Sequence, residues 1–414
     1  MITILAMSCF SATLKAEELK LSLEEAAAIA LRDNRDILLK TQDVNIAKAK
    51  IAEAKAGLYP RVDFTGTWSD TRGLYANDLT QATTQTTLKH YLYKGGKTIN
   101  TIKYNGYNFE VSEALLDKAK QDTVLSVKKA FYALLLADEL ARLNQQILDN
   151  TEQHLESEKK RYTKGQISES DILKIESSLA SVKKAYEESL NQKESFQALL
   201  NNLLCLENDV KLSPDAKLEY ESKDISFDQG LLQALRQRPE IRQYEAQGKA
   251  DQKAIEVAKA DSQPQIYASW DYYSRSHLSA SATRNWNDYN VIGLNFSWPI
   301  FDGWVTRAKV EQAIADLKAT QLNKDKAMRD ITLDVKDAYL VLKDSLLQQE
   351  AQESDIKLYA DNLNFLKKKY DAGLASEIDL DDAKIKYEVS LFNKKQAVYD
   401  CLIARSNLED AIGR

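Results

Sequence analysis

The chain contains one long pattern twice, and this duplication restricts its fold more than any other feature. The segment from Tyr162 to Ile172 recurs from Tyr370 to Leu380, 208 positions later, with Tyr, Gly, Ser, Glu and Asp at matching places. Nearer the N-terminus the offset is 204, which aligns Pro60 with Pro264. A repeat of this length exceeds the roughly 20–50 residues of a solenoid module. The sequence therefore predicts two copies of a whole architectural unit.

Each copy is predicted to run helix, strand, strand, helix, helix. The first helix has apolar residues on one face and ends before Pro60. Beyond the proline the period changes to two, which is typical of strands. Strands are expected at about 61–71 and 84–93 in the first copy and at about 265–274 and 289–301 in the second.

Helical spacing resumes after the strands and continues for an unusual length. From Lys97 to Lys164 no proline interrupts it, and one helix of that length spans on the order of 100 Å. The 3-4 spacing of Val335, Ala338 and Leu342 indicates a coiled-coil seam. Gly165 and Gly373 stand where the chain must reverse, because a tight turn between helices needs a positive φ.

The strands, and not the helices, suggest a way to cross a membrane. The chain has 29% charged residues, a mean hydropathy of −0.46 and a net charge of −6, and no run of about 18 apolar residues that could form a transmembrane helix. Alternating strands can cross only as a closed barrel, which satisfies every backbone group internally. Four strands are too few, because known barrels start at about eight. Three chains would supply twelve strands.

Several of these features together resemble the TolC-like outer-membrane efflux proteins. The resemblance is carried by Leu21-Ser22-Leu23-Glu24-Glu25-Ala26 at a helix start, by Ala-rich sequence before Pro60 and Pro264, by Trp298-Pro299-Ile300-Phe301-Asp302-Gly303, and by the two Tyr-x-x-Gly turns. It extends from about residue 19 to the end of the chain. One departure is Tyr91, which stands where the second copy has Pro299.

The resemblance implies a fold and a function. The expected fold is mostly α with a membrane β-barrel: a trimeric α-helical tunnel plus a 12-stranded barrel with four strands from each chain. The expected function is that of an outer-membrane exit duct of a tripartite efflux or type I secretion system. Its implied partners are two further copies of the chain, a periplasmic adaptor, an inner-membrane pump of the RND or ABC type and outer-membrane lipid. Whether the cargo is a drug, a metal or a protein stays open.

The domain organisation follows from the repeat. Residues 1–18 are interpreted as the remnant of a leader segment on a truncated or misassigned start, 19–207 as the first repeat, 208–226 as a connecting segment and 227–414 as the second repeat. Cys9 follows Ala6-Met7-Ser8, a weak lipobox, so a lipid anchor stays open. Cys205 and Cys401 fall in helical sequence at unequal repeat positions, which favours isolated buried thiols.

Nothing in the sequence indicates catalysis, a cofactor or nucleic-acid binding. His90, His154 and His277 are scattered without zinc-ligand spacing or a neighbouring nucleophile. Gly95-Gly96 lacks the rest of a phosphate-binding loop. Lys367-Lys368-Lys369 is interpreted as a solvated helix face in a net acidic chain.

Acidic residues after the second turn are the strongest candidates for a pore site. Asp379 and Asp382 lie three apart and share a helix face, with Asp381 between them. Such acids also favour a helix start through the helix dipole. The resemblance matches Asp379 and Asp382 to the paired aspartates of the family's periplasmic constriction. In a trimer each would form a carboxylate ring that attracts cations.

The resemblance also assigns a latch and a docking surface. Tyr370 and Asp171 match residues whose hydrogen bond helps to close the family's entrance, whereas Ala375 replaces an expected arginine and suggests a looser gate. The turns, with Gly165, Gln166, Ile167 and Ser168 in one and Gly373, Leu374, Ala375 and Ser376 in the other, are expected to meet the adaptor.

The long helices alone would also suit a non-membrane coiled-coil scaffold. The duplicated alternating strands argue against that alternative, since a scaffold has no use for Trp68, Trp270, Trp298 and Tyr272 at membrane-facing positions.

Overall fold

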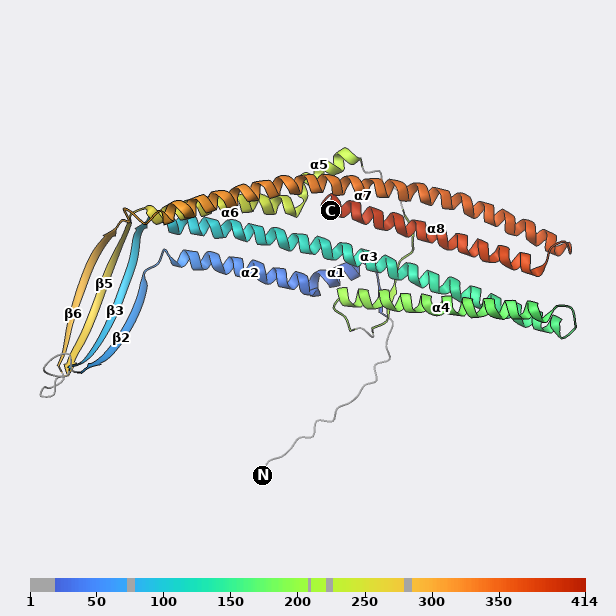
Figure 1. Ribbon diagram of the computed structural model, residues 1–414, viewed down its shortest axis with the longest axis horizontal. Coiled ribbons are helices and arrows are strands. Elements are labelled where there is room, and N and C mark those ends of the chain that lie inside the picture. The colour runs from blue at the N-terminus through green and yellow to red at the C-terminus, as the bar shows by residue number, and fades with distance from the viewer. Residues whose placement is uncertain (1–18, 73–78, 208–209, 221–225, 279–284) are drawn as a thin grey trace, which may run out of the picture. The chain divides into compact units, whose positions relative to one another are not determined.

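The computed structural model describes residues 19–72, 79–207, 210–220, 226–278 and 285–414 of the chain. The predicted leader, Cys9 and part of the connecting segment lie outside these residues. The elements (Figure 1) are β1 Leu19–Leu21, α1 Leu23–Asp33, α2 Arg35–Ala56, β2 Arg61–Thr71, β3 Leu79–Lys94, α3 Lys97–Tyr162, α4 Glu169–Leu203, β4 Leu212–Pro214, α5 Phe227–Gln237, α6 Pro239–Lys259, η1 Ala260–Ser262, β5 Gln265–Leu278, β6 Asn285–Ser297, α7 Val305–Asp371 and α8 Glu377–Ala411.

The first helix of each copy is divided in two at the same place. The break falls at Asn34, with φ −61° and ψ 131°, and at Arg238, with φ −61° and ψ 132°. In both cases the backbone N–H still donates to the carbonyl four residues earlier, of Ala30 or Ala234. Pro239 then opens α6, at the first helical position where its missing N–H costs nothing. The two copies of the repeat therefore have the same backbone angles at this break.

The long helices are present in both copies. α3 has 66 residues and α7 has 67, and each is followed by a short turn and a helix of 35 residues, α4 or α8. Each turn holds one glycine at positive φ, Gly165 at 70° and Gly373 at 73°. The predicted helix reversals at these glycines are thus present in the structure.

The chain has two compact units, and each combines segments from both copies of the repeat. One unit contains the described residues up to Leu39 together with 118–238 and 330–414. Its core lies where α1, α3, α4 and β4 meet, with Phe131 and Leu134 fully buried. β1 pairs in parallel with β4, which ties the start of the chain to the connecting segment. Along the seam predicted on α7, Val335 and Leu342 are buried and Tyr339 packs on Phe227.

The helices α4 and α8 end in the same way, although one end carries a cysteine. Cys205 adopts φ 55° just after α4, and Gly413 adopts φ 82° at the equivalent place after α8. At both ends the next N–H reaches back to a helix carbonyl, from Leu206 to Asn201 and from Arg414 to Glu409. The prediction that Cys205 lies in a helix was wrong, because the repeat needs a left-handed residue there.

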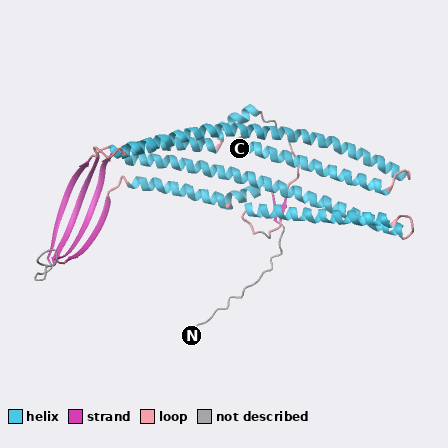
Figure 2. Ribbon diagram, viewed as in Figure 1, coloured by secondary structure: helices cyan, strands magenta, loops and turns pink. Residues whose placement is uncertain are grey.

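The other unit contains residues 40–117 and 239–329 and includes a four-stranded sheet. The strand order is β2-β3-β5-β6 (Figure 1) with every pair antiparallel, so the two copies lie side by side and β2 and β6 are the edges. The same four strands are magenta in Figure 2. Three strands reach or pass both of their predicted ends, whereas β6 begins earlier, at Asn285, and ends at Ser297 instead of residue 301. Pro299 explains the earlier end, because it has no N–H to donate to a ladder. Its counterpart Tyr91 pairs with Tyr267 in the ladder, and β3 continues to Lys94.

Candidate functional site

The predicted docking turns share one geometry. In the first turn the N–H of Gly165 donates to the carbonyl of Tyr162 at 2.8 Å and that of Gln166 donates to Arg161 at 3.0 Å. In the second turn Gly373 and Leu374 make the same two bonds, to Tyr370 and Lys369. An added Cβ at either glycine would meet no atom within 4 Å. The glycines are therefore required by the backbone angle and not by crowding.

A serine and an aspartate begin the helix after each turn. The Ser168 hydroxyl donates to the Asp171 carboxylate at 2.7 Å, and the Ser376 hydroxyl donates to Asp379 at 2.7 Å. Asp379 also accepts the backbone N–H of Ser376 and completes a capping box. These hydrogen bonds hold the pKa of both carboxyls below the usual range, with the serine hydroxyl as the largest cause. Asp171 and Asp379 are equivalent in the repeat and both act as helix-start residues.

The remaining two acids of the candidate pore site differ from Asp379. Asp382 is exposed on α8. Asp381 is half-buried, lies 3.6 Å from Nδ1 of His154 and accepts from Lys384 at 2.8 Å. Both acids line a cavity of about 220 Å³ with residues of α3 and α4. Unlike Asp379, neither Asp381 nor Asp382 belongs to the capping box described at the start of α8.

The predicted latch is not formed within the described single chain. The Tyr370 side chain is 39% exposed, and no hydrogen bond joins it to Asp171 among the described residues. The Asp171 carboxylate is already used by Ser168 and by Lys174, the latter at 3.4 Å.

The sheet has one apolar face and one polar face. The apolar face carries exposed side chains, with Phe64 at 72% and Trp68 at 69%, and on β5 it includes Trp270 and Tyr272. The polar face carries Gln85, whose amide donates to Asp271 at 3.0 Å and to Tyr273 at 2.9 Å. Trp298 lies beyond β6, where its indole N–H donates to the carbonyl of Ser262, so its predicted strand position was wrong.

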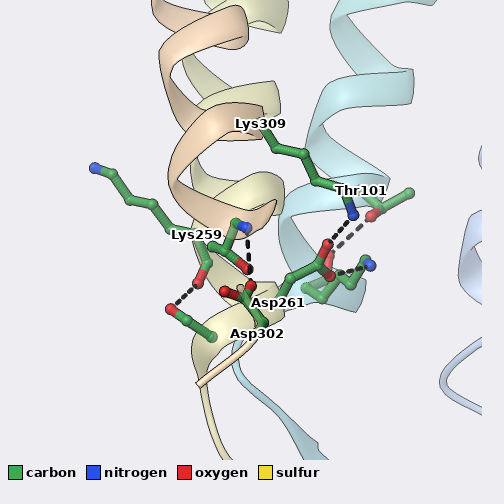
Figure 3. A network of polar contacts seen from close by, with 8 residues as sticks. Thr101, Lys259, Asp261, Asp302 and Lys309 are labelled. Carbon is green, nitrogen blue, oxygen red and sulfur yellow. Dashed lines mark hydrogen bonds and ion pairs between the residues drawn. The ribbon is translucent and has the colours of Figure 1, made fainter. Parts of the chain in front are cut away.

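A carboxylate at the strand-to-helix junction was missed by sequence reasoning. Asp261, in η1, joins Lys97 of α3 at 2.5 Å and Lys309 of α7 at 2.9 Å (Figure 3). These pairs hold the pKa of Asp261 below its usual range, and the bond from Lys97 is the largest cause. Asp302 begins α7 nearby by accepting the N–H of Thr306 at 2.8 Å. The signal in the sequence was weak, because these charges come from three distant segments.

No cluster of three metal-binding side chains occurs among the described residues, and none of the described helices is long and apolar enough to cross a membrane. Within the described residues both cysteines are free. Cys401 is buried, donates to Gln349, and has a pKa raised to about 11, chiefly by desolvation. The interpretation of Cys401 as a buried structural thiol fits this environment.

The chain matches a family model, relatives and solved structures. A model of the family "Outer membrane efflux protein" matches residues 27–204 and 231–414. The outer membrane protein TolC of Escherichia coli K12 is 22% identical over 437 residues, 99% of this chain and 85% of TolC. Protein CyaE of Bordetella pertussis is 21% identical over 365 residues, 87% of this chain and 77% of CyaE.

Solved structures also match over most of the chain. The Campylobacter jejuni CmeC outer membrane channel superposes with a TM-score of 0.79 at 19% identity, over 94% of this chain and 85% of CmeC. A structure of CusC, described in terms of transmembrane channel formation, superposes with a TM-score of 0.76 at 19% identity, over 94% of this chain and 92% of CusC.

The chain belongs to the outer membrane efflux protein family. It has the TolC-like fold of outer-membrane channels, with its long helices in a periplasmic tunnel. It is an outer-membrane exit duct of efflux or secretion systems and not an enzyme. The family membership excludes the alternative of a non-membrane scaffold.

Proposed function

We propose that three copies of this chain close one twelve-stranded barrel. The single observation that supports the proposal is the sheet of four strands, which has apolar and polar faces and whose edges, β2 and β6, are unpaired among the described residues. Alternating directions let β6 of one copy pair antiparallel with β2 of the next. The apolar face would then meet lipid and the polar face would line the lumen.

The experiment for this proposal is a mass measurement of the detergent-purified protein, followed by conductance in a planar bilayer. The expected result is a trimer that forms discrete channels. A stable monomer, or a dimer soluble without detergent, would contradict the proposal. Because an edge strand with unpaired N–H groups aggregates readily, the sample must be a single species before its mass is interpreted.

The proposed unit of duplication is 19–207 and 227–414, joined by 208–226. Supporting it, the paired breaks at Asn34 and Arg238 and the paired helix ends at Cys205 and Gly413 recur in both copies. Each subunit would then supply two similar hairpins and two similar helical arms.

The turns at Gly165 to Ser168 and at Gly373 to Ser376 are proposed to contact a periplasmic adaptor, which links the duct to an inner-membrane pump of the RND or ABC type. Both turns are exposed and both present the same hydrogen-bonded reversal. Leu374, with 76% of its surface exposed, would supply an apolar contact to the adaptor.

Asp379 and Asp382 are proposed to form the pore constriction, and Tyr370 and Asp171 to form a latch in the assembled trimer. The exposure of Asp382 supports the first assignment.

The hydrogen bonds of the two aspartates determine which variant tests the pore assignment. Asp379→Asn would disturb the capping box as well as the charge, whereas Asp382→Asn removes charge alone. Single-channel recording of Asp382→Asn should show weaker cation selectivity and weaker block by multivalent cations. Wild-type selectivity in that variant would refute the assignment.

A further inference from the structure

Two lysines and two tyrosines gather at the end of β3, where the strand meets α3. The Lys89 ammonium lies 3.8 Å from the ring centroid of Tyr267 and 4.8 Å from that of Tyr91. The Lys94 ammonium lies 4.5 Å from the Tyr91 ring. The two rings lie 5.5 Å apart at a tilt of 57°. Each cation is therefore held against an aromatic ring.

A β-bulge brings Lys94 to the polar face, where Lys89, Tyr91 and Tyr267 already lie. Tyr91 stands opposite Tyr267, but Tyr93 stands opposite Ile266, so Leu92 is an extra residue in β3. Without it, Lys94 would fall on the face of Leu88 and Trp270. With it, Lys94 stands opposite Gln265, on the side of Lys89 and Tyr91.

The two lysines of this cluster form no ion pair within the described residues, although Asp63 and Asp271 lie on the same face one register position away from Lys89. In the described part of the chain neither Lys89 nor Lys94 has a carboxylate partner. Arg61, which is opposite Lys89 in the register, pairs with Asp63 at 2.8 Å. The cluster thus combines two fixed positive charges with the faces of two half-buried rings.

This combination fits one ligand chemistry. A carboxylate can pair with an ammonium group that has no counter-charge, and an aromatic ring on the same molecule can stack on a tyrosine. We propose that Lys89, Lys94, Tyr91 and Tyr267 form a collar that binds aromatic carboxylate anions in the lumen of the duct. The collar rests on the proposed trimer, because only a closed barrel makes this face a lumen. Each subunit would then add the same positive, tyrosine-lined segment to one ring.

The first test is current block in a planar bilayer, with sodium benzoate as the probe. Sodium acetate tests charge without a ring, and sodium cyclohexanecarboxylate tests a saturated ring of similar size. We expect benzoate to block at lower concentration than either control anion. The Lys89→Gln/Lys94→Gln variant should weaken benzoate block by about fivefold or more, while Lys89→Arg/Lys94→Arg keeps it. Tyr91→Leu/Tyr267→Leu should make benzoate and acetate equivalent. Unchanged benzoate block in the glutamine variant would overturn the collar.

A second measurement does not depend on conduction. Saturation-transfer difference NMR of benzoate with the purified protein in detergent should show ring signals that the glutamine variant loses. If the wild-type protein is a conducting trimer and neither experiment detects benzoate at the lysines, only the collar fails. If the protein is not a trimer, the proposed duct assembly fails, and the NMR experiment still decides whether the lysines and tyrosines bind the anion.

Discussion

Two residues other than glycine adopt left-handed backbone angles among the described residues, Cys205 at φ 55° and Trp304 at φ 68°. Each has a glycine at the equivalent repeat position, Gly413 and Gly96. A side chain at such an angle costs roughly 1–2 kcal/mol. At the residue scale the two copies therefore share the same backbone conformation at these positions. They differ in whether a side chain strains that conformation.

The replacement Cys205→Gly is expected to stabilise the unit that contains α4. Glycine removes the left-handed strain from the folded state, but it also raises the conformational entropy of the unfolded chain. The first effect should be larger, so the free energy of unfolding should rise by about 0.5–1 kcal/mol. The control is Gly413→Ala, which should destabilise by about 1 kcal/mol, because Gly413 has φ 82° and its Cβ would lie 3.3 Å from the backbone of Arg238. Thermal unfolding in detergent measures both. A lower melting temperature for Cys205→Gly would mean that the thiol contributes packing that outweighs the strain.

The start of α8 should weaken at low pH. The folded pKa of Asp379 is lowered by its bonds from Ser376. Its stabilising effect is therefore complete above the ordinary carboxyl pKa of about 4 and is lost as the pH falls through the lowered folded value. Hydrogen exchange of residues 379–383, corrected for intrinsic rates, should show protection that falls in this range. In Ser376→Ala this dependence should weaken, because only the backbone N–H of residue 376 would still donate to Asp379. An equal fall in both proteins would refute the capping role of the serine hydroxyl.

At the element scale, the junction between strands and helices is the most constrained place described. Gly95 and Gly96 adopt φ 60° and 75°, and Asp261 ties η1 to the starts of α3 and α7. A Cβ on Gly95 would lie 2.5 Å from Cβ of Gln263 and 2.9 Å from the carbonyl of Ala260. The same addition at Gly96 would meet only the Asn100 amide, at 3.6 Å.

Gly95→Ala and Gly96→Ala form a matched pair that follows from these distances. Both carry the backbone strain of roughly 1 kcal/mol, but only Gly95→Ala adds a clash with backbone, so it should cost several times more. Trp304, which adopts the Gly96 conformation with a side chain, supports tolerance at that position. Yield of folded protein and melting temperature distinguish the two variants. Equal losses would show that the contact with η1 is not important.

The helix turns can be tested apart from the junction. Gly165→Val and Gly373→Val should each strain the reversal by roughly 1–2 kcal/mol and reduce crosslinking to the adaptor. Gly248→Val is the control, because Gly248 lies inside α6 with ordinary helical angles and an added Cβ there meets no atom within 4 Å. If both turn variants crosslink and export normally, the turns are not the docking surface.

At the scale of the whole molecule, the two faces of the sheet should respond differently to charge. Phe64→Lys places an ammonium on the apolar face near the middle of β2, where the cost in a membrane barrel is about 2–4 kcal/mol. Thr65→Lys, one residue later, points to the polar face and should be tolerated. The amount of heat-stable trimer in outer membranes measures the difference. Loss of trimer in both variants, or in neither, would contradict the assignment of the faces.

Much of the architecture could be predicted from the sequence because it depends on local pattern and on duplication. The alternation around Phe64, the long helices that end just before Gly165 and Gly373, and the equivalence of the two copies all follow from periodicity and from turn chemistry. The interaction of Ser376 with Asp379 is also local, because the two residues lie three apart in sequence. The interpretation of Asp379 as a helix-start acid, as opposed to a pore residue, came from its position after the turn alone. The roles of Asp379 and Asp382 in a pore stay predictions.

Only the tertiary structure decided the features that depend on distant segments. The order β2-β3-β5-β6 sets the two copies side by side, because β3 pairs with β5 across about half of the chain. The bulge at Leu92 turns Lys94 to the polar face, since an extra residue reverses every following side chain. Asp261 meets Lys97 and Lys309 only after three segments converge. Local pattern determines which elements form, whereas register and long-range charge pairing are set by packing between segments far apart in sequence.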